Sequence, residues 1–250
     1  MWRTLLIVAV LSSTRSAADC ASWSFKVWPP PGTVIPPNAR LVIQGYDRAQ
    51  EMVAKIAGLN PRLLVKSPDP LTFSPPIRLK VVEVHTGEMK ITQAVLQPER
   101  LLIPGAQYTL AFEHTVEDPD FAPKGPLRWM AGGEPDSAAP TWSAPPLAGP
   151  GHFKQMGCGP IEEARVQLAV KDQSPWLVLS RVQGATGGVR EYLLTPNDEG
   201  ELMVGHSMCM GAFQLGEGEW SLELVAVDVA GNSAPAPGGP LRFKGLDPRK

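Results

Sequence analysis

The chain lacks the features that mark several large classes of protein. Its formal net charge is −2, which does not support a nucleic-acid partner held by a basic surface. It contains no G-x-S-x-G nucleophile elbow, no phosphate-binding loop and no dinucleotide-binding fingerprint. The histidines lie in four different segments, as His85, His114, His152 and His206. The sequence therefore predicts a non-enzymatic protein without a cofactor.

Long apolar runs are also missing. The clearest one, Thr4 to Leu11, is too short to span a bilayer. It follows the positively charged start Met1-Trp2-Arg3 and precedes the small residues Ser16-Ala17-Ala18. This order is typical of a secretory signal peptide, which we place at residues 1–18 with cleavage after Ala18. The mature chain is expected to be exported to the periplasm, the cell surface or the medium, with no transmembrane segment.

Cysteine is scarce, with 3 in the chain, and the first lies close to the expected cleavage point. A cysteine just after an exported apolar run raises the alternative of a bacterial lipoprotein, acylated at Cys20 and anchored by its lipid. The lipoprotein motif, however, requires a small residue before the cysteine and usually has Leu at −3. Asp19 and Ala17 occupy those positions. A free mature N-terminus is therefore favoured, with a lipid anchor at Cys20 as the alternative.

Proline and glycine are abundant, at 27 and 24 residues, and they separate short apolar segments along the whole chain. Several segments alternate with a period of two; Ile77, Leu79 and Val81, for example, alternate with Arg78 and Lys80. Helical character is limited to residues 50–58. Short alternating segments with frequent turns are typical of β-sandwiches. The predicted fold is all-β: two tandem immunoglobulin-like β-sandwich domains after a cleaved signal peptide.

The domain boundary is predicted from a change of composition. From Pro123 to Gly151 the chain is rich in Pro, Gly, Ala and Ser, and the stretch 132–136 has the composition of a flexible, exposed crossing. Domain 1 then covers 19–133 and domain 2 covers 134–250. In domain 2, the turn at 196–200 is predicted to join segments 192–194 and 201–204 as a β-hairpin.

The two halves share one internal pattern. Each has a leucine, a glycine-containing corner, an aromatic residue and an alternating strand, at 102–112 and again at 215–224. In sandwiches, an aromatic at this corner pins the connection by a hydrogen bond back to the chain. We expect Tyr108 to use its hydroxyl for this bond and Trp220 to use its indole N–H.

These motifs carry a resemblance to known families. The segment Pro31-Gly32-Thr33 to Ala39, together with Leu102-Ile-Pro-Gly-Ala-Gln-Tyr108-Thr-Leu, resembles the bacterial Ig-like domain described in S-layer proteins. The second half, mainly through Val227-Asp-Val-Ala-Gly-Asn232, is similar to Ig-like or fibronectin-III-like modules. The resemblance covers most of residues 23–245. It implies spacer, adhesive or accessory domains at the cell envelope, usually without catalysis.

Two segments of domain 2 have unusual side chains. Cys158 lies in one and Cys209 in the other, and in an exported protein the simplest prediction is a disulfide between them. On the chain-entropy model such a bond stabilises the fold by about 4 kcal/mol. The alternative is a copper site that uses His206, Met208 and Cys209, because imidazole, thioether and thiolate are ligands suited to copper. A disulfide would make the thiolate unavailable, and no metal site is predicted under the preferred reading.

Two smaller features have both a functional and a structural interpretation. Asp228 and Asn232 could contribute to a calcium site, but a turn in which they bond the local backbone and Gly231 has positive φ is favoured. Trp23, Trp28, Trp142 and Trp176 could form a sugar-stacking platform, whereas tryptophans more commonly pack in cores or between domains.

The functional prediction is a binding, adhesion or spacer module at the bacterial cell envelope, with an unidentified protein or glycan as partner. The alternatives are a periplasmic copper-binding protein and a carbohydrate-binding accessory module.

Overall fold

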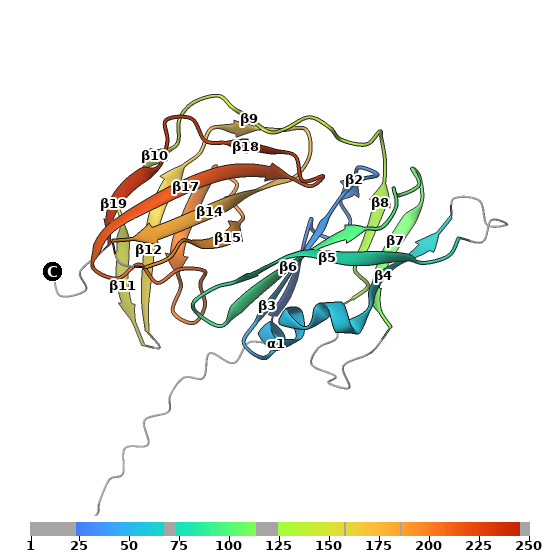
Figure 1. Cartoon of the computed structure of the whole chain (residues 1–250), viewed down its shortest axis with the longest axis horizontal. Helices are drawn as coiled ribbons and strands as arrows, with labels where there is room; N and C mark the ends of the chain where they lie inside the picture. The colour runs from blue at the N-terminus through green and yellow to red at the C-terminus, as the bar shows by residue number, and fades with distance from the viewer. Residues whose placement is uncertain (1–23, 68–73, 114–124, 158, 186, 246–250) are drawn as a thin grey trace, which may run out of the picture.

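The computed structural model describes residues 24–67, 74–113, 125–157, 159–185 and 187–245. The predicted signal peptide lies outside these residues, as do Cys20, Trp23, His114 and Cys158. Within the described residues, strands form most of the regular structure (Figure 1). The all-β prediction is therefore confirmed, and the strand order below is that of two Ig-like sandwiches.

Domain 1 is a β-sandwich whose two sheets are connected by one long strand, β5. Its strands pair in the order β1-β3-β6-β5-β4-β7-β8-β2. The register of β5 against β6 shifts between Val81 and Glu83, and β5 takes part in both sheets. The strands are β1 (Ser24–Trp28), β2 (Val34–Ile35), β3 (Leu41–Tyr46), β4 (Pro61–Lys66), β5 (Ile77–Thr86), β6 (Ile91–Pro98), β7 (Gln107–Phe112) and β8 (Arg128–Ala131). The N-terminal segment joins both sheets, because β1 is antiparallel to β3 and β2 is parallel to β8.

The helical segment predicted at residues 50–58 is present as α1 (Arg48–Ala54) and the 3₁₀ helix η1 (Ile56–Leu59). Helix α1 packs closely on β3. A Cβ atom added at Gly45 would lie 2.2 Å from the main-chain oxygen of Ala49, so this position of β3 requires glycine.

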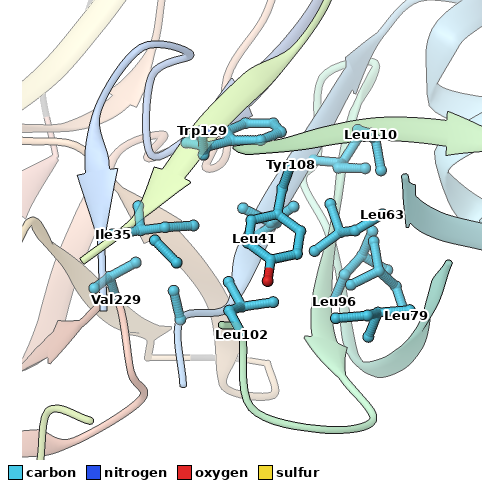
Figure 2. Packing of buried hydrophobic residues seen from close by; sticks show 14 of the residues in the cluster. Ile35, Leu41, Leu63, Leu79, Leu96, Leu102, Tyr108, Leu110, Trp129 and Val229 are labelled. Atoms are coloured by element: carbon cyan, nitrogen blue, oxygen red, sulfur yellow. The ribbon is translucent and has the colours of Figure 1, made fainter. Parts of the chain in front are cut away.

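The core of domain 1 lies between its two sheets. Leu41, Leu63, Leu96, Tyr108 and Trp129 are all buried in it (Figure 2). Strands β3 and β6 are also buried on the face that turns away from this core. Burial on both faces means that another part of the chain covers the outside of the sheet, and domain 2 provides that cover.

Domain 2 is a second sandwich. In one sheet, β12 pairs with β16 along one edge and with β10 and β11 along the other. The opposite sheet has the order β15-β14-β17. Strands β18 and β19 both pair with the far edge of β17. The short strands β9 and β13 pair separately. The strands are β9 (Thr141–Trp142), β10 (Leu147–Ala148), β11 (His152–Met156), β12 (Gly159–Gln167), β13 (Val170–Lys171), β14 (Trp176–Gly184), β15 (Arg190–Leu194), β16 (Glu201–His206), β17 (Gly218–Asp228), β18 (Ser233–Pro235) and β19 (Leu241–Gly245). The chain leaves domain 1 after β8, which ends at Ala131, and enters domain 2 at β9, which begins at Thr141.

The predicted β-hairpin around residues 196–200 is wrong, although both of its strands exist. Strand β15 pairs with β14, and β16 pairs with β12 in the opposite sheet. The turn itself forms, because the Asn197 side chain accepts hydrogen bonds from the main chain of Glu199 and Glu201. Its far side is held by β12, where the Gln167 amide donates to the carbonyl of Glu199. The turn therefore carries the chain across the sandwich instead of folding it back on itself.

The two predicted aromatic corners are confirmed. The Ile103 N–H donates to the Tyr108 hydroxyl at 2.6 Å, and Figure 2 shows that hydroxyl directed toward the Leu102 segment. In domain 2, the Trp220 indole N–H donates to the carbonyl of Gly216 at 3.0 Å. Different side chains perform the same structural task in the two sandwiches.

Candidate binding site between the two domains

The interface between the domains is formed by the outer faces of two sheets. Strands β3 and β6 of domain 1 direct Val42 and Val95 away from their own core. Strands β14 and β15 of domain 2 direct Leu177 and Leu193 toward them, and the four buried side chains form one apolar cluster. We call these four residues the interface cluster. The period of two in each strand explains the arrangement, since alternate residues serve the domain core and the interface.

Each domain also contributes one side chain to the core of the other. Val229, which follows β17, is fully buried in the core cluster of domain 1, on the Ile35 side (Figure 2). Ile91, at the start of β6, is buried in the core cluster of domain 2 with Phe213. The main chain of Val229 is fixed as well, because its carbonyl accepts the Arg40 N–H at 2.6 Å.

A side-chain amide completes the edge of β15. The Gln93 amide donates to the Leu193 carbonyl at 2.8 Å, and its oxygen accepts the Leu193 N–H at 3.2 Å. Both groups are buried, so Gln93 takes the place of a neighbouring strand at this edge. Gln93 also donates to Gln44 at 3.0 Å, which ties the amide to β3.

Polar contacts extend along the crossing between the domains. The main chain of Asp136 exchanges two hydrogen bonds with the Asn38 side chain, at 2.7 and 2.9 Å. Its side chain accepts a hydrogen bond from Ser174, and its carbonyl accepts one from Asn232 at 3.1 Å. The crossing is largely exposed, as expected, and Asp136 within it is bonded to both domains.

A charged contact closes the opposite side of the interface. Glu88 of domain 1 forms an ion pair with Arg190, whose guanidinium lies 4.9 Å from the centre of the Trp220 ring. The Glu88 carboxylate also accepts the Gln214 N–H at 2.6 Å. The apolar cluster, the exchanged side chains and these polar contacts together fix the two domains relative to each other.

A cavity of about 340 Å³ opens next to the interface cluster. All four residues of that cluster line the cavity and form its apolar floor. The floor continues along domain 2 through Leu179, Val225 and Val227. Trp28, at the end of β1, stands at the cavity wall. The charged side chains on the wall are Arg40, Glu83, Arg181 and Asp228.

Three of these four charged side chains have partners. Glu83 lies 3.1 Å from His85, Arg181 donates to Glu191 at 2.6 Å, and Asp228 accepts two hydrogen bonds from Asn232 at 2.8 Å. Burial raises the pKa of the Asp228 carboxyl above its ordinary value, although the Asn232 hydrogen bonds oppose the shift.

Arg40 differs from the other three. Its Nε is buried and has no hydrogen-bond partner among the described residues, and no carboxylate among them forms an ion pair with it. Its guanidinium lies directly against the backbone of Gly231. A Cβ atom there would be 2.3 Å from Cζ of Arg40, so glycine, with φ +91°, leaves the room for this contact.

The proposed copper ligands lie elsewhere, at the end of β16. His206 is buried, with Nδ1 at 2.9 Å from the Ser207 carbonyl and Nε2 at 3.5 Å from Glu162. Nδ1 therefore carries a proton, and a metal at Nε2 would have to displace Glu162. Met208 and Cys209 are half-buried. The described residues contain no group of three or more His, Cys, Asp or Glu side chains that could hold a metal ion.

The predicted disulfide involves Cys158, which lies outside the described residues, so the pairing stays a prediction. The residues next to the two cysteines do lie close together. A Cβ atom at Gly159 would be 3.1 Å from the main-chain oxygen of Met208, and Glu162 faces His206 in the β12–β16 pair.

The other sequence candidates have structural roles in the described residues. Trp142 and Trp176 pack against the core of domain 2, and the Trp142 indole N–H donates to the Ala234 carbonyl at 3.0 Å. Trp28 packs against both the domain 1 core and the interface cluster. Asp228 and Asn232 form the expected turn, with positive φ at Gly231. Packing and turn formation are thus confirmed as the roles of these residues.

Sequence reasoning missed Gln93 and Arg40. A signal for Gln93 was present, because it is a polar residue directly before the apolar run Ala94-Val95-Leu96 of strand β6, and a buried amide needs hydrogen-bond partners. Arg40 stands directly before the apolar strand β3, but its nearness to Gly231 depends on the packing of the domains and leaves no local signal.

No helix among the described residues is both long and apolar enough to cross a membrane. No family model matches the chain, and no curated protein matches it.

Several solved structures show a distant likeness. The type I pullulanase from Bacillus subtilis strain 168 complexed with maltose is 11% identical with a TM-score of 0.28, over 86% of this chain and 24% of that one. Dimeric latent PorU from Porphyromonas gingivalis is 12% identical with a TM-score of 0.27, over 90% of this chain and 19% of that one. The tandem Ig repeats of Dlar are 10% identical with a TM-score of 0.21, over 90% of this chain and 96% of that one.

This chain thus spans about a quarter of the length of the pullulanase. The likeness in each case is too weak to carry a functional argument. The assignment of two Ig-like sandwiches rests on the strand order of the chain itself.

Proposed function

We propose that the chain is a non-enzymatic exported protein whose two Ig-like domains act as one rigid binding, adhesion or spacer module at the bacterial cell envelope. The observation that carries the proposal is the exchange of Val229 and Ile91 between the two cores. A spacer or adhesive module transmits position or force only if its domains keep a fixed geometry, and domains with small polar interfaces usually move. An exchange of core side chains opposes such motion.

Small-angle X-ray scattering of the mature chain tests the rigidity. We expect the wild type to scatter as one rigid body. Leu177→Asp places a carboxylate in the interface cluster without entering either domain core, so its radius of gyration should increase. The matched control is Leu147→Asp, because Leu147 is 67% exposed, and it should leave the profile unchanged. Wild-type scattering that requires two independently moving domains would contradict the proposal.

The intact mass of the exported protein tests the compartment and the anchor. A chain that begins at Asp19 supports cleavage after Ala18, and a diacyl or triacyl mass on Cys20 supports the lipid-anchored form. A full-length mass, with the protein retained inside the cell, would remove the exported module from consideration.

Peptide mapping without reduction separates the module from the copper alternative. A cross-linked peptide containing Cys158 and Cys209 would leave copper without its thiolate. Two free thiols with bound copper would favour the metal-binding function instead.

A binding role is distinguished from a pure spacer role by ligand capture. Glycan arrays and pull-down from envelope extracts should return a specific partner for the wild type. If neither returns one, a spacer role remains as the proposed function.

A further inference from the structure

We propose that the cavity between the domains binds a small amphipathic monocarboxylate, with its carboxylate on Arg40 and its hydrocarbon part on the apolar floor. This inference goes beyond the rigid module, since a spacer needs no such cavity.

The floor favours a hydrocarbon ligand. It includes aliphatic side chains from both domains, such as Val42 and Val95 on one side and Leu177, Leu179 and Val225 on the other. A volume of about 340 Å³ is within the range of small-molecule sites. An apolar body of a few carbons would cover this floor and displace water from it, which is favourable in proportion to the area buried.

The charge of the ligand follows from the partners of the wall residues. Glu83, Arg181 and Asp228 are already bonded to His85, Glu191 and Asn232. Arg40 alone among the four has neither an ion-pair partner nor a hydrogen bond from its side chain within the described residues. A guanidinium at an apolar wall is best matched by a carboxylate, which accepts charge-assisted hydrogen bonds. An ammonium ligand would meet two carboxylates that already have partners.

The position of Arg40 also suits a binding role. Its backbone N–H bonds the Val229 carbonyl, and its guanidinium lies on the Gly231 backbone. Both contacts come from the turn after β17, so the cation from domain 1 is held in place by domain 2. A side chain fixed before the ligand arrives loses less conformational entropy on binding.

Isothermal titration calorimetry with three probes of the same chain length tests the proposal. The probes are octanoate, octan-1-ol and octylammonium. Octanoate should bind one to one and should bind at least tenfold more tightly than either of the other two. Amide shifts in a nuclear magnetic resonance titration should concentrate at residues 177–181 and 225–233.

Two variants locate the site. Arg40→Gln removes the charge and should weaken octanoate binding at least tenfold, whereas the control Arg242→Gln, an exposed arginine on β19, should not change it. Leu179→Trp fills the cavity and should abolish binding of the probe. Thermal melting of each variant shows whether it is folded, and if Arg40→Gln does not fold, Leu179→Trp decides alone.

Three results would overturn the proposal. The first is no heat and no amide shifts with octanoate for the wild type. The second is equal affinity for octanoate and octan-1-ol. The third is wild-type affinity in folded Leu179→Trp. None of these results bears on the scattering test of rigidity, so the two proposals fail separately.

Discussion

At the scale of single residues, the Tyr108 hydroxyl makes a contact that no other atom of the side chain can replace. It accepts the Ile103 N–H in a partly buried corner of domain 1. Tyr108→Phe leaves that N–H without its partner, and we expect a loss of about 1–3 kcal/mol in the free energy of unfolding. Equilibrium unfolding in urea measures it. The matched control is Tyr192→Phe, because the hydroxyl of Tyr192 lies 3.4 Å from its nearest acceptor and should cost less. Equal losses would contradict the role of the corner.

A second residue-scale prediction concerns Glu162, which is buried next to His206. Burial raises the pKa of its carboxyl above the ordinary value, and His206 opposes the shift only in part. Between the ordinary and the raised pKa, the folded chain keeps a proton that the unfolded chain has lost. The stability contributed by this group is therefore present in acid and falls as the pH rises through the folded pKa.

Glu162→Gln keeps the neutral form at every pH. Its stability relative to the wild type should therefore increase as the pH rises above about 4.5, the ordinary pKa. Urea midpoints of both proteins at about pH 4 and about pH 7.5 measure the difference. An identical difference at the two pH values would show that the carboxyl has the same pKa in the folded and the unfolded chain, and would contradict the raised pKa.

At the scale of the elements, strand β15 depends on a side chain of the other domain. Gln93→Ala leaves the N–H and the carbonyl of Leu193 unpaired, and we expect a loss of about 2–4 kcal/mol. Hydrogen exchange should accelerate in the peptide that covers β15 before it does in β14. Gln97→Ala is the control, because Gln97 is exposed on the same strand β6. Unchanged exchange in β15 would mean that the amide does not protect this edge.

The elements also show how far local patterns reach. Period-two alternation was sufficient to predict a strand such as β5, and the corner pattern predicted two hydrogen bonds correctly. The pairing of β15 and β16 could not be derived in the same way. A turn with Asn197 and Gly200 fits a hairpin and a crossing between sheets equally well, and the choice depends on Gln167 of a distant strand. Non-local contacts of this kind leave no mark on the turn sequence.

At the scale of the whole molecule, the exchanged side chains should make the two domains unfold together. We expect a single calorimetric transition for the wild type, with equal calorimetric and van't Hoff enthalpies. Val229→Ala should lower the stability by about 1–3 kcal/mol, since it leaves a cavity in a core. The loss of stability should be seen in the unfolding of domain 1, although Val229 belongs to domain 2. Val189→Ala, at an exposed position, is the control.

Two separate calorimetric transitions, with Val229→Ala lowering the stability of domain 2 alone, would show that the exchanged side chains do not couple the unfolding of the two domains.

The candidate site depends on the packing of the two domains against each other, which explains why the sequence did not predict it. Arg40 and Gly231 lie far apart in the chain, and the cavity exists only where two sandwiches meet. Features contained in one strand or one turn could be predicted, such as the Asp228–Asn232 turn. Features that require the outer faces of two sheets to meet could not.

The position of Val229 late in the chain also affects how domain 1 folds while the protein is being synthesised. The strands of domain 1 are complete once the chain has reached Ala131, yet one buried side chain of its core is supplied only after nearly the whole of domain 2 has followed. During synthesis from the N-terminus, the first domain is left with an unfilled space in its core until β17 is finished. The leading half of the polypeptide should thus remain easier to unfold while it emerges, and only the completed chain reaches its full resistance to unfolding.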